Sequence, residues 1–188
     1  MPLSNASASR LLVENMSLLK NLSFDNGVLD LACGSGRNGL LLARDNIHVT
    51  FADCDREKLG LLAGELRDQG LEGVCWQIDL ETTSSDPLSH KWFDLVLVFN
   101  YLHRPLMASI REVVRPGGLI VYETFTVHQP QFGKPTNPDY LLRPGELLES
   151  FGDWEVEHYF EGEKQSGSKK NRCAKASLIA RKPKQALR

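Results

Sequence analysis

The stretch that decides the fold reads VLDLACGSGRNG, from Val28 to Gly39. A short apolar run holding one acid is followed by glycines at positions 34, 36 and 39, in the spacing G-x-G-x-x-G. Glycine lets a backbone turn tightly and approach a ligand closely, so this spacing predicts a strand, a ligand-binding turn and a helix. We expect the strand at 27–31 and the helix at 38–44.

Strand and helix signals alternate after this turn. Helical spacing of leucines predicts a helix at 56–69 with Gly70 as its C-cap, and apolar residues mark a second helix at 106–114. Pro116-Gly117-Gly118 is expected to end that second helix. Further strands are expected at 47–52, 74–78, 93–99 and 119–124. The 93–99 run is almost wholly apolar, as is typical of a strand covered on both faces.

The C-terminal third begins with a Pro-rich segment that contains Pro130, Pro135, Pro138 and Pro144 and is long enough to suggest a functional loop. Pro144 suits the first position of a helix at 144–151. Two β-like runs, 154–160 and 174–180, flank a Gly/Ser/Lys-rich linker at 161–173. This pattern predicts a hairpin with a flexible tip.

Five strand–helix units predict an α/β protein of three layers, with a Rossmann-like, doubly wound, mostly parallel sheet closed by an antiparallel C-terminal hairpin. Leucines with partial helical spacing predict that residues 1–26 form a helical lid or cover. Residues 27–188 would then be the main part of a single domain. Ligands of such folds bind beyond the carboxyl ends of the strands, near the switch in strand order.

Composition and charge narrow the possible partners. The 188 residues carry a net charge of -2, but residues 1–163 hold 13 Lys+Arg against 24 Asp+Glu, whereas 164–188 hold 9 Lys+Arg and no acid. A basic segment keeps a polyanionic partner open. No apolar run approaches the roughly 18 residues of a membrane helix, and no secretion signal is visible, so we expect a cytoplasmic protein. The four cysteines form no Cys-x-x-Cys pair, and no metal site is expected.

The acids around the glycine turn discriminate between cofactors. Asp53 follows Gly34 by 19 residues and could accept hydrogen bonds from both hydroxyls of a ribose. That suits both NAD and S-adenosylmethionine (SAM). Asp30, inside the first strand, would repel a pyrophosphate but could receive an ammonium group. SAM has that ammonium and no phosphate, so it is favoured, and an NAD-dependent oxidoreductase remains an alternative.

The run from Val28 to Gly36 resembles the first motif of class I SAM-dependent methyltransferases. Later landmarks stand in the order of that family: Asp53, Ile78-Asp79-Leu80, Phe93-Asp94-Leu95-Val96 and Arg115-Pro116-Gly117-Gly118. The shorter run from Cys33 to Asn38 is also similar to tellurite-resistance-type methyltransferases, which alkylate small nucleophiles.

This resemblance implies SAM as cofactor and S-adenosylhomocysteine (SAH) as product. Asp30 would lie near the methionine amino group, Asp53 at the ribose and Asp79 at the adenine amine. The other implied cofactor-binding residues are Cys33, Gly34, Ser35, Gly36, Asn38, Cys54, Leu80 and Asn100. For Cys33, Cys54 and Leu80 the alternative is a space-filling role.

Candidate residues for the acceptor side follow the fourth and fifth strands. His103 could act as a base near neutral pH, and Arg104 could bind an anionic acceptor. Both could instead flank the next helix. Tyr101 could contact the acceptor or form a wall of the cofactor pocket, and Glu123 could take a proton, bind a cationic substrate or fix the Pro-rich loop. His48, His90 and His158 fall away from the expected rim.

The leading hypothesis is therefore an enzyme that methylates a small acceptor, with a sulfur or chalcogen nucleophile as one option. The basic segment at 164–188 leaves an RNA-directed methyltransferase as an alternative, although solvated loops also explain it. A third alternative is a SAM-binding protein without catalysis.

Overall fold

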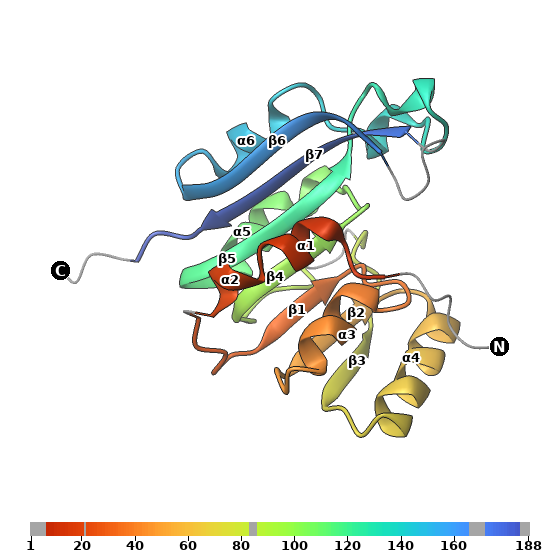
Figure 1. The fold of residues 1–188 in the computed structure, drawn as a ribbon, viewed down its shortest axis with the longest axis vertical. Helices are drawn as coiled ribbons and strands as arrows, with labels where there is room; N and C mark the ends of the chain where they lie inside the picture. Colours follow the sequence, from red (N-terminus) through yellow and green to blue (C-terminus); the bar gives the residue numbers. More distant parts are fainter. Residues whose placement is uncertain (1–6, 21, 83–85, 166–171, 185–188) are drawn as a thin grey trace.

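The computed structural model describes residues 7–20, 22–82, 86–165 and 172–184. Seven strands form one sheet in the order β3-β2-β1-β4-β5-β7-β6, as Figure 1 shows. Neighbours among β1 to β5 pair in parallel, and β7 is antiparallel to both β5 and β6. The predicted α/β fold, a mostly parallel sheet with an antiparallel C-terminal hairpin, is confirmed. The strands are β1 (Val28–Leu31), β2 (Val49–Asp53), β3 (Gly73–Gln77), β4 (Phe93–Phe99), β5 (Val114–Phe125), β6 (Glu155–Gln165) and β7 (Arg172–Arg181).

Helices cover both faces of this sheet. On one face lie α1 (Arg10–Glu14), α2 (Met16–Leu19), α3 (Arg37–Ala43) and α4 (Arg56–Asp68). On the other lie α5 (Met107–Val113) and α6 (Glu146–Phe151). Each face has its own apolar core, and every residue of β4, the strand between β1 and β5, is buried. The described residues also form three short 3₁₀ helices: η1 (Arg104–Leu106), η2 (Gln129–Gln131) and η3 (Pro138–Tyr140).

The N-terminal segment packs directly on the sheet. Leu11, Leu12 and Leu19 are buried in the same apolar cluster as α3 and α4. The segment is also tied to the start of α3, because Ser9 N donates to Asn38 Oδ1 at 2.8 Å and Arg37 donates to Ser7 O at 2.8 Å. No helix in the described part of the chain has the length and apolarity to cross a membrane.

Three predicted boundaries are wrong. The strand expected at 119–124 begins at Val114, because Val114 pairs with Phe93 and the backbone of Gly117 and Gly118 bonds to Lys182. The Pro116-Gly117-Gly118 run therefore lies within β5, at a register shift. The helix expected from Pro144 begins at Glu146, after Gly145, which adopts a left-handed φ of 74°.

The third correction concerns the C-terminal hairpin. The paired parts of β6 and β7 reach Gln165 and Arg172, so most of the predicted flexible linker at 161–173 is strand. The predicted tip itself, residues 166–171, lies outside the described residues.

The topology of the sheet determines where the candidate residues lie. The chain runs from β1 outward to β2 and β3, and then returns to the other side of β1 with β4 and β5. The strand order therefore switches between β1 and β4, where folds of this kind bind ligands beyond the carboxyl ends of the strands. The glycine turn follows β1 and Asn100 follows β4, so both lie at this switch point.

Candidate functional site

The glycine turn joins β1 to α3 through left-handed backbone at Gly34 and Gly36, with φ of 57° and 72°. The two glycines serve different purposes. A Cβ atom at Gly36 would lie 2.7 Å from Leu62 Cδ2, so this glycine lets the turn pack against α4. A Cβ atom at Gly34 would meet no described atom within 4 Å. Gly34 therefore presents bare backbone toward open space, where a ligand can approach it.

Asp53 lies beside this open backbone. Its Oδ2 accepts a hydrogen bond from Gly34 N at 2.7 Å, and its Oδ1 accepts one from Asp55 N at 2.9 Å. Asp55, two residues later, instead caps α4 by accepting from the amides of Glu57 and Lys58. The structure thus brings Asp53 to the turn and gives Asp55 a helix-capping role.

Asp30 is buried beneath the turn, with an exposed fraction of 2%. Its Oδ2 accepts from Gly39 N at 2.9 Å, at the start of α3. Burial raises the pKa of Asp30 to about 7, although the bond from Gly39 and the charge of Arg37 oppose it. The carboxyl group is therefore balanced between its two protonation states near neutral pH, and a nearby cation would favour the ionised form.

The other predicted cofactor residues differ in exposure. Asp79 and Cys54 are exposed on the rim, where Asp79 Oδ1 accepts from Glu81 N at 2.9 Å. Leu80 is buried in the apolar core. Burial and the charge of Asp30 raise the pKa of Cys33, which keeps that partly buried sulfur a neutral thiol.

A cavity of about 540 Å³, here called the loop cavity, opens at the carboxyl end of β4. Asn100, Tyr101 and Leu102 line it from the strand side, and Lys134, Pro135 and Tyr140 line it from the Pro-rich loop. The Tyr101 hydroxyl is buried and has no hydrogen-bond partner among the described residues. Burial raises the pKa of Tyr101, so the hydroxyl keeps its proton and can donate to a ligand.

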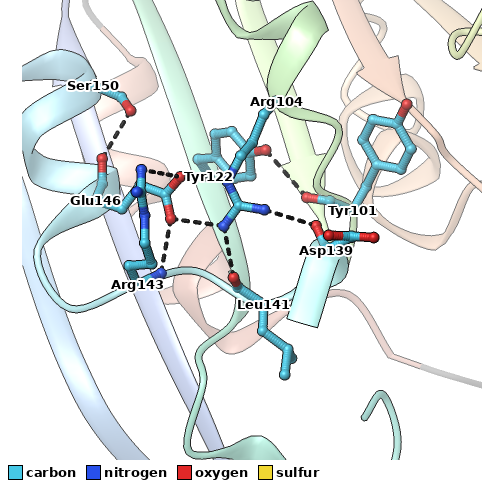
Figure 2. A network of polar contacts seen from close by, with 8 residues as sticks. All are labelled: Tyr101, Arg104, Tyr122, Asp139, Leu141, Arg143, Glu146 and Ser150. Carbon is cyan, nitrogen blue, oxygen red and sulfur yellow. Dashed lines mark hydrogen bonds and ion pairs between the residues drawn. The ribbon is translucent and has the colours of Figure 1, made fainter. Parts of the chain in front are cut away.

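Arg104, predicted next to Tyr101 as an anion ligand, faces a different set of groups (Figure 2). Its guanidinium binds both carboxylate oxygens of Glu146, at 2.6 and 2.9 Å, and donates to the carbonyls of Asp139 and Leu141. Burial alone would raise the pKa of Glu146, but Arg104 and Arg143 outweigh it and lower that pKa to about 2. Four of the five N–H groups of Arg104 are used, so the geometry favours the flanking role, in which Arg104 fastens the Pro-rich loop to α6. His103, half-buried, directly precedes η1.

A second cavity of about 620 Å³, here called the hairpin cavity, lies between the N-terminal segment and the β6–β7 hairpin. Glu123, near the end of β5, has an exposed fraction of 7% and lines this cavity. Its Oε1 lies 3.1 Å from Lys175 Nζ and its Oε2 lies 2.7 Å from Lys164 Nζ. Lys175 Nζ also lies 2.5 Å from Asn100 Oδ1. The structure thus brings the predicted residues Asn100 and Glu123 together, through a lysine that the sequence did not reveal.

Glu123 is held in its ionised form. Burial alone would raise its pKa, but Lys175 and Lys164 outweigh burial and lower it. A carboxylate that is stabilised in this way is a poor proton acceptor near neutral pH. Both oxygens are also occupied by ammonium groups, which leaves no simple place for a cationic substrate.

The position of His158 differs from the one expected from the sequence. It was expected away from the rim, yet it lines the hairpin cavity, with Nε2 at 3.2 Å from Ser177 Oγ. Lys164 was likewise interpreted as part of a solvated hairpin tip. Neither position carries a local signal, because both depend on β7 entering the sheet between β5 and β6.

Most described basic residues of the 164–188 segment contact the chain itself. Arg172 pairs with Glu163, Arg181 pairs with Glu157, and Lys182 Nζ lies within hydrogen-bonding distance of the carbonyls of Arg111 and Val114. These cations are therefore partly neutralised or occupied within the fold, in addition to the two lysines at Glu123.

Comparison with known proteins gives consistent results. Residues 28–118 match a family model described as a methyltransferase domain. Ubiquinone biosynthesis O-methyltransferase of Aeromonas salmonicida (strain A449) is 31% identical over 106 residues, which cover 54% of this chain and 44% of that protein. The match thus spans less than half the length of this curated relative.

Two solved structures share the fold. TehB from Haemophilus influenzae has a TM-score of 0.77 at 22% identity, over 95% of this chain and 64% of that chain. A SAM-dependent methyltransferase from Methanosarcina mazei has a TM-score of 0.66 at 20% identity, over 96% of this chain and 100% of that chain. At these identities the two structures establish a common fold.

Proposed function

Because this chain contains a class I SAM-dependent methyltransferase domain, we propose that it transfers a methyl group from SAM to a small-molecule acceptor. SAM supplies an electrophilic methyl group: the acceptor atom bonds to the methyl carbon as the carbon–sulfur bond breaks and leaves its electron pair on sulfur, giving SAH. The observation that carries the proposal is the bare backbone of Gly34 beside the Asp53 carboxylate. We also propose a cytoplasmic location, which suits four free thiols.

The residues around the turn fit this cofactor. Asp53 would accept from the ribose hydroxyls, and Asp79 on the exposed rim would accept from the adenine amine. Asp30, with its pKa near 7, would gain a favourable partner in the methionine ammonium. A group of carboxylates at the turn suits a cofactor with a cationic end and without phosphate.

The residues on the acceptor side would act mainly by positioning. Asn100 lines the loop cavity and contacts Lys175 of the hairpin cavity, so it lies where the two spaces approach each other. The unpaired Tyr101 hydroxyl would orient the acceptor, and holding a nucleophile in line with the methyl group supplies much of the acceleration in such reactions. His103 remains a candidate base. The curated relative is an O-methyltransferase, and we propose an oxygen, sulfur or chalcogen nucleophile for this chain.

Calorimetric titration with SAH tests the cofactor assignment. We expect wild-type protein to bind SAH, and Asp53→Ala to weaken binding at least about tenfold, or roughly 1.4 kcal/mol. Asp55→Ala is the matched control, because it removes a nearby carboxylate that caps α4 and should cost about 1 kcal/mol of stability with little change in SAH affinity. Wild-type protein that fails to bind SAH, or equal losses in both variants, would refute the assignment.

A further inference from the structure

We propose that the methyl acceptor carries an anionic group, and that Lys164 and Lys175 bind this group in the hairpin cavity. The proposal rests on the proposed function and names the chemical class of substrate for the same site. It also differs from the expectation based on sequence, which assigned an anionic acceptor to Arg104.

The charge of the residues that line the hairpin cavity is the first reason to expect an anionic ligand. Among the described lining residues the cations are Arg10, Arg37, Lys164 and Lys175, and the carboxylates are Glu14 and Glu123. Arg10 and Glu14 neutralise each other at 2.7 Å. Glu123 has a single negative charge between two ammonium groups. The lysine pair therefore keeps a surplus positive charge, in a protein whose residues 1–163 are otherwise strongly acidic.

The number of N–H donors on Lys164 and Lys175 is the second reason. An ammonium group has three N–H donors. Lys175 Nζ donates to Asn100 Oδ1 and Glu123 Oε1, and Lys164 Nζ donates to Glu123 Oε2 and Ser177 Oγ. Within the described residues no third oxygen accepts a hydrogen bond from either ammonium group, although Lys175 Nζ lies 4.6 Å from the centre of the Phe125 ring and Lys164 Nζ lies 5.0 Å from that of Phe160. Glu123 fixes both ammonium groups, and an anion could accept from the two remaining donors.

The side chains are also partly withdrawn from water. The exposed fraction of the Lys175 side chain is 12%, and that of Lys164 is 29%. His158 lines the same cavity, and burial and Lys164 lower its pKa. Near neutral pH it therefore adds no positive charge to that of the two lysines. A charged hydrogen bond in such a place is stronger than one at an open surface.

The lysines belong to the hairpin wall of the cavity, whereas Arg37, the residue directly after Gly36, lines the same cavity from the side of the glycine turn. Lys175 lies on β7, three strand positions from β1, and Lys164 lies on β6, one position further. At about 4.8 Å per strand, the backbone of β7 is roughly 14 Å from that of β1. Lys175 thus contacts Asn100 from the β7 side, whereas the glycine turn lies on the β1 side, and we therefore assign the lysines to the acceptor rather than to the carboxylate of SAM.

Paired probes of equal shape test this proposal without knowledge of the natural acceptor. SAH-loaded protein is titrated with acetate against acetamide and with benzoate against benzamide. We expect at least one carboxylate to bind about tenfold more tightly than its amide. In Lys164→Gln/Lys175→Gln this ratio should fall to about one. Lys20→Gln, at an exposed position next to α2, removes the same charge elsewhere and should leave the ratio unchanged.

A third variant should raise the affinity for carboxylates instead of lowering it. Glu123→Gln removes the competing carboxylate, so carboxylate binding should strengthen by about threefold. Lys164→Gln alone, at the more exposed lysine, serves if the double variant does not fold, and should lower the ratio partially. Circular dichroism verifies the fold of each variant.

Two outcomes overturn the proposal. One is a wild-type protein that distinguishes neither carboxylate from its amide. The other is a double variant that loses SAH affinity by more than about twofold while the carboxylate preference persists, which would assign the lysines to the cofactor. If SAH does not bind but the carboxylate preference holds in protein without SAH, the proposed function fails and the anion site stands.

Discussion

The two halves of the carboxyl rim of the sheet hold their carboxylates by different means. On the glycine-turn side, Asp53 and Asp30 accept hydrogen bonds from backbone amides, and the longest separation between partners is 19 residues. On the hairpin side, Glu123 is held by side-chain ammonium groups from residues 41 and 52 positions later. One half depends on local backbone geometry, and the other depends on the completed sheet.

This difference has a chemical counterpart. Backbone amides leave the net negative charge of Asp53 in place, which suits a cationic cofactor. The two lysines more than neutralise Glu123, which suits an anionic partner. The acidic half and the basic half approach each other at Asn100, whose side chain contacts Lys175 and whose backbone amide bonds to Glu123 O.

The largest predicted effect tests the local half. Gly36→Ala should destabilise the protein by about 3 to 4 kcal/mol, because the new methyl group meets Leu62 and the backbone is left-handed. Gly34→Ala should cost only about 1 to 2 kcal/mol, since its methyl group meets no described atom. Urea denaturation measures both values. Equal losses would contradict the separate roles assigned to the two glycines.

A smaller effect depends on pH. The pKa of Asp30 is near 7 in the folded protein, above the ordinary value of 3.8 that applies when the chain is unfolded. The stability contributed by the protonated group is therefore present below about pH 4 and is lost as the pH rises to 7. Relative to Asp30→Asn, wild-type protein should lose about 2 kcal/mol between pH 5 and pH 8. Parallel pH profiles of the two proteins would refute the burial of an ionisable Asp30.

The smallest effect tests the long-range half. Glu123→Ala and Lys175→Ala should each destabilise the protein, and the double variant should lose less than the sum of the two. We expect a coupling of about 1 kcal/mol in a double-mutant cycle followed by urea denaturation. The cycle Glu14→Ala with Arg10→Ala is the control, because that exposed pair should couple by less than about 0.5 kcal/mol. Strict additivity at Glu123 would show that the lysines do not hold it.

The same division explains what the sequence could predict. The strands and the glycine turn follow from neighbouring residues, whose spacing encodes turns, caps and periodicity. Two predictions based on local residues were wrong. The helix expected from Pro144 begins later because Gly145 caps it, and Pro116-Gly117-Gly118 lies within β5 because Gly117 and Gly118 form backbone hydrogen bonds with the distant Lys182. The Glu123 cluster required the position of β7 in the sheet. Hydrophobic periodicity does not encode that position.

The order of the strands also sets an order of assembly. The strand β6 lies at the edge of the sheet and pairs with β7, yet the ribosome synthesises β6 first. All strands of the glycine-turn half, β1 to β3, precede β6 and β7 in the sequence. Only when β7 inserts beside β5 can Lys175 reach Glu123, so the proposed binding site for the acceptor is completed last. A nascent chain halted before β7 would carry the glycine turn and Lys164 but not Lys175, so the proposed anion site would lack one of its two ammonium groups.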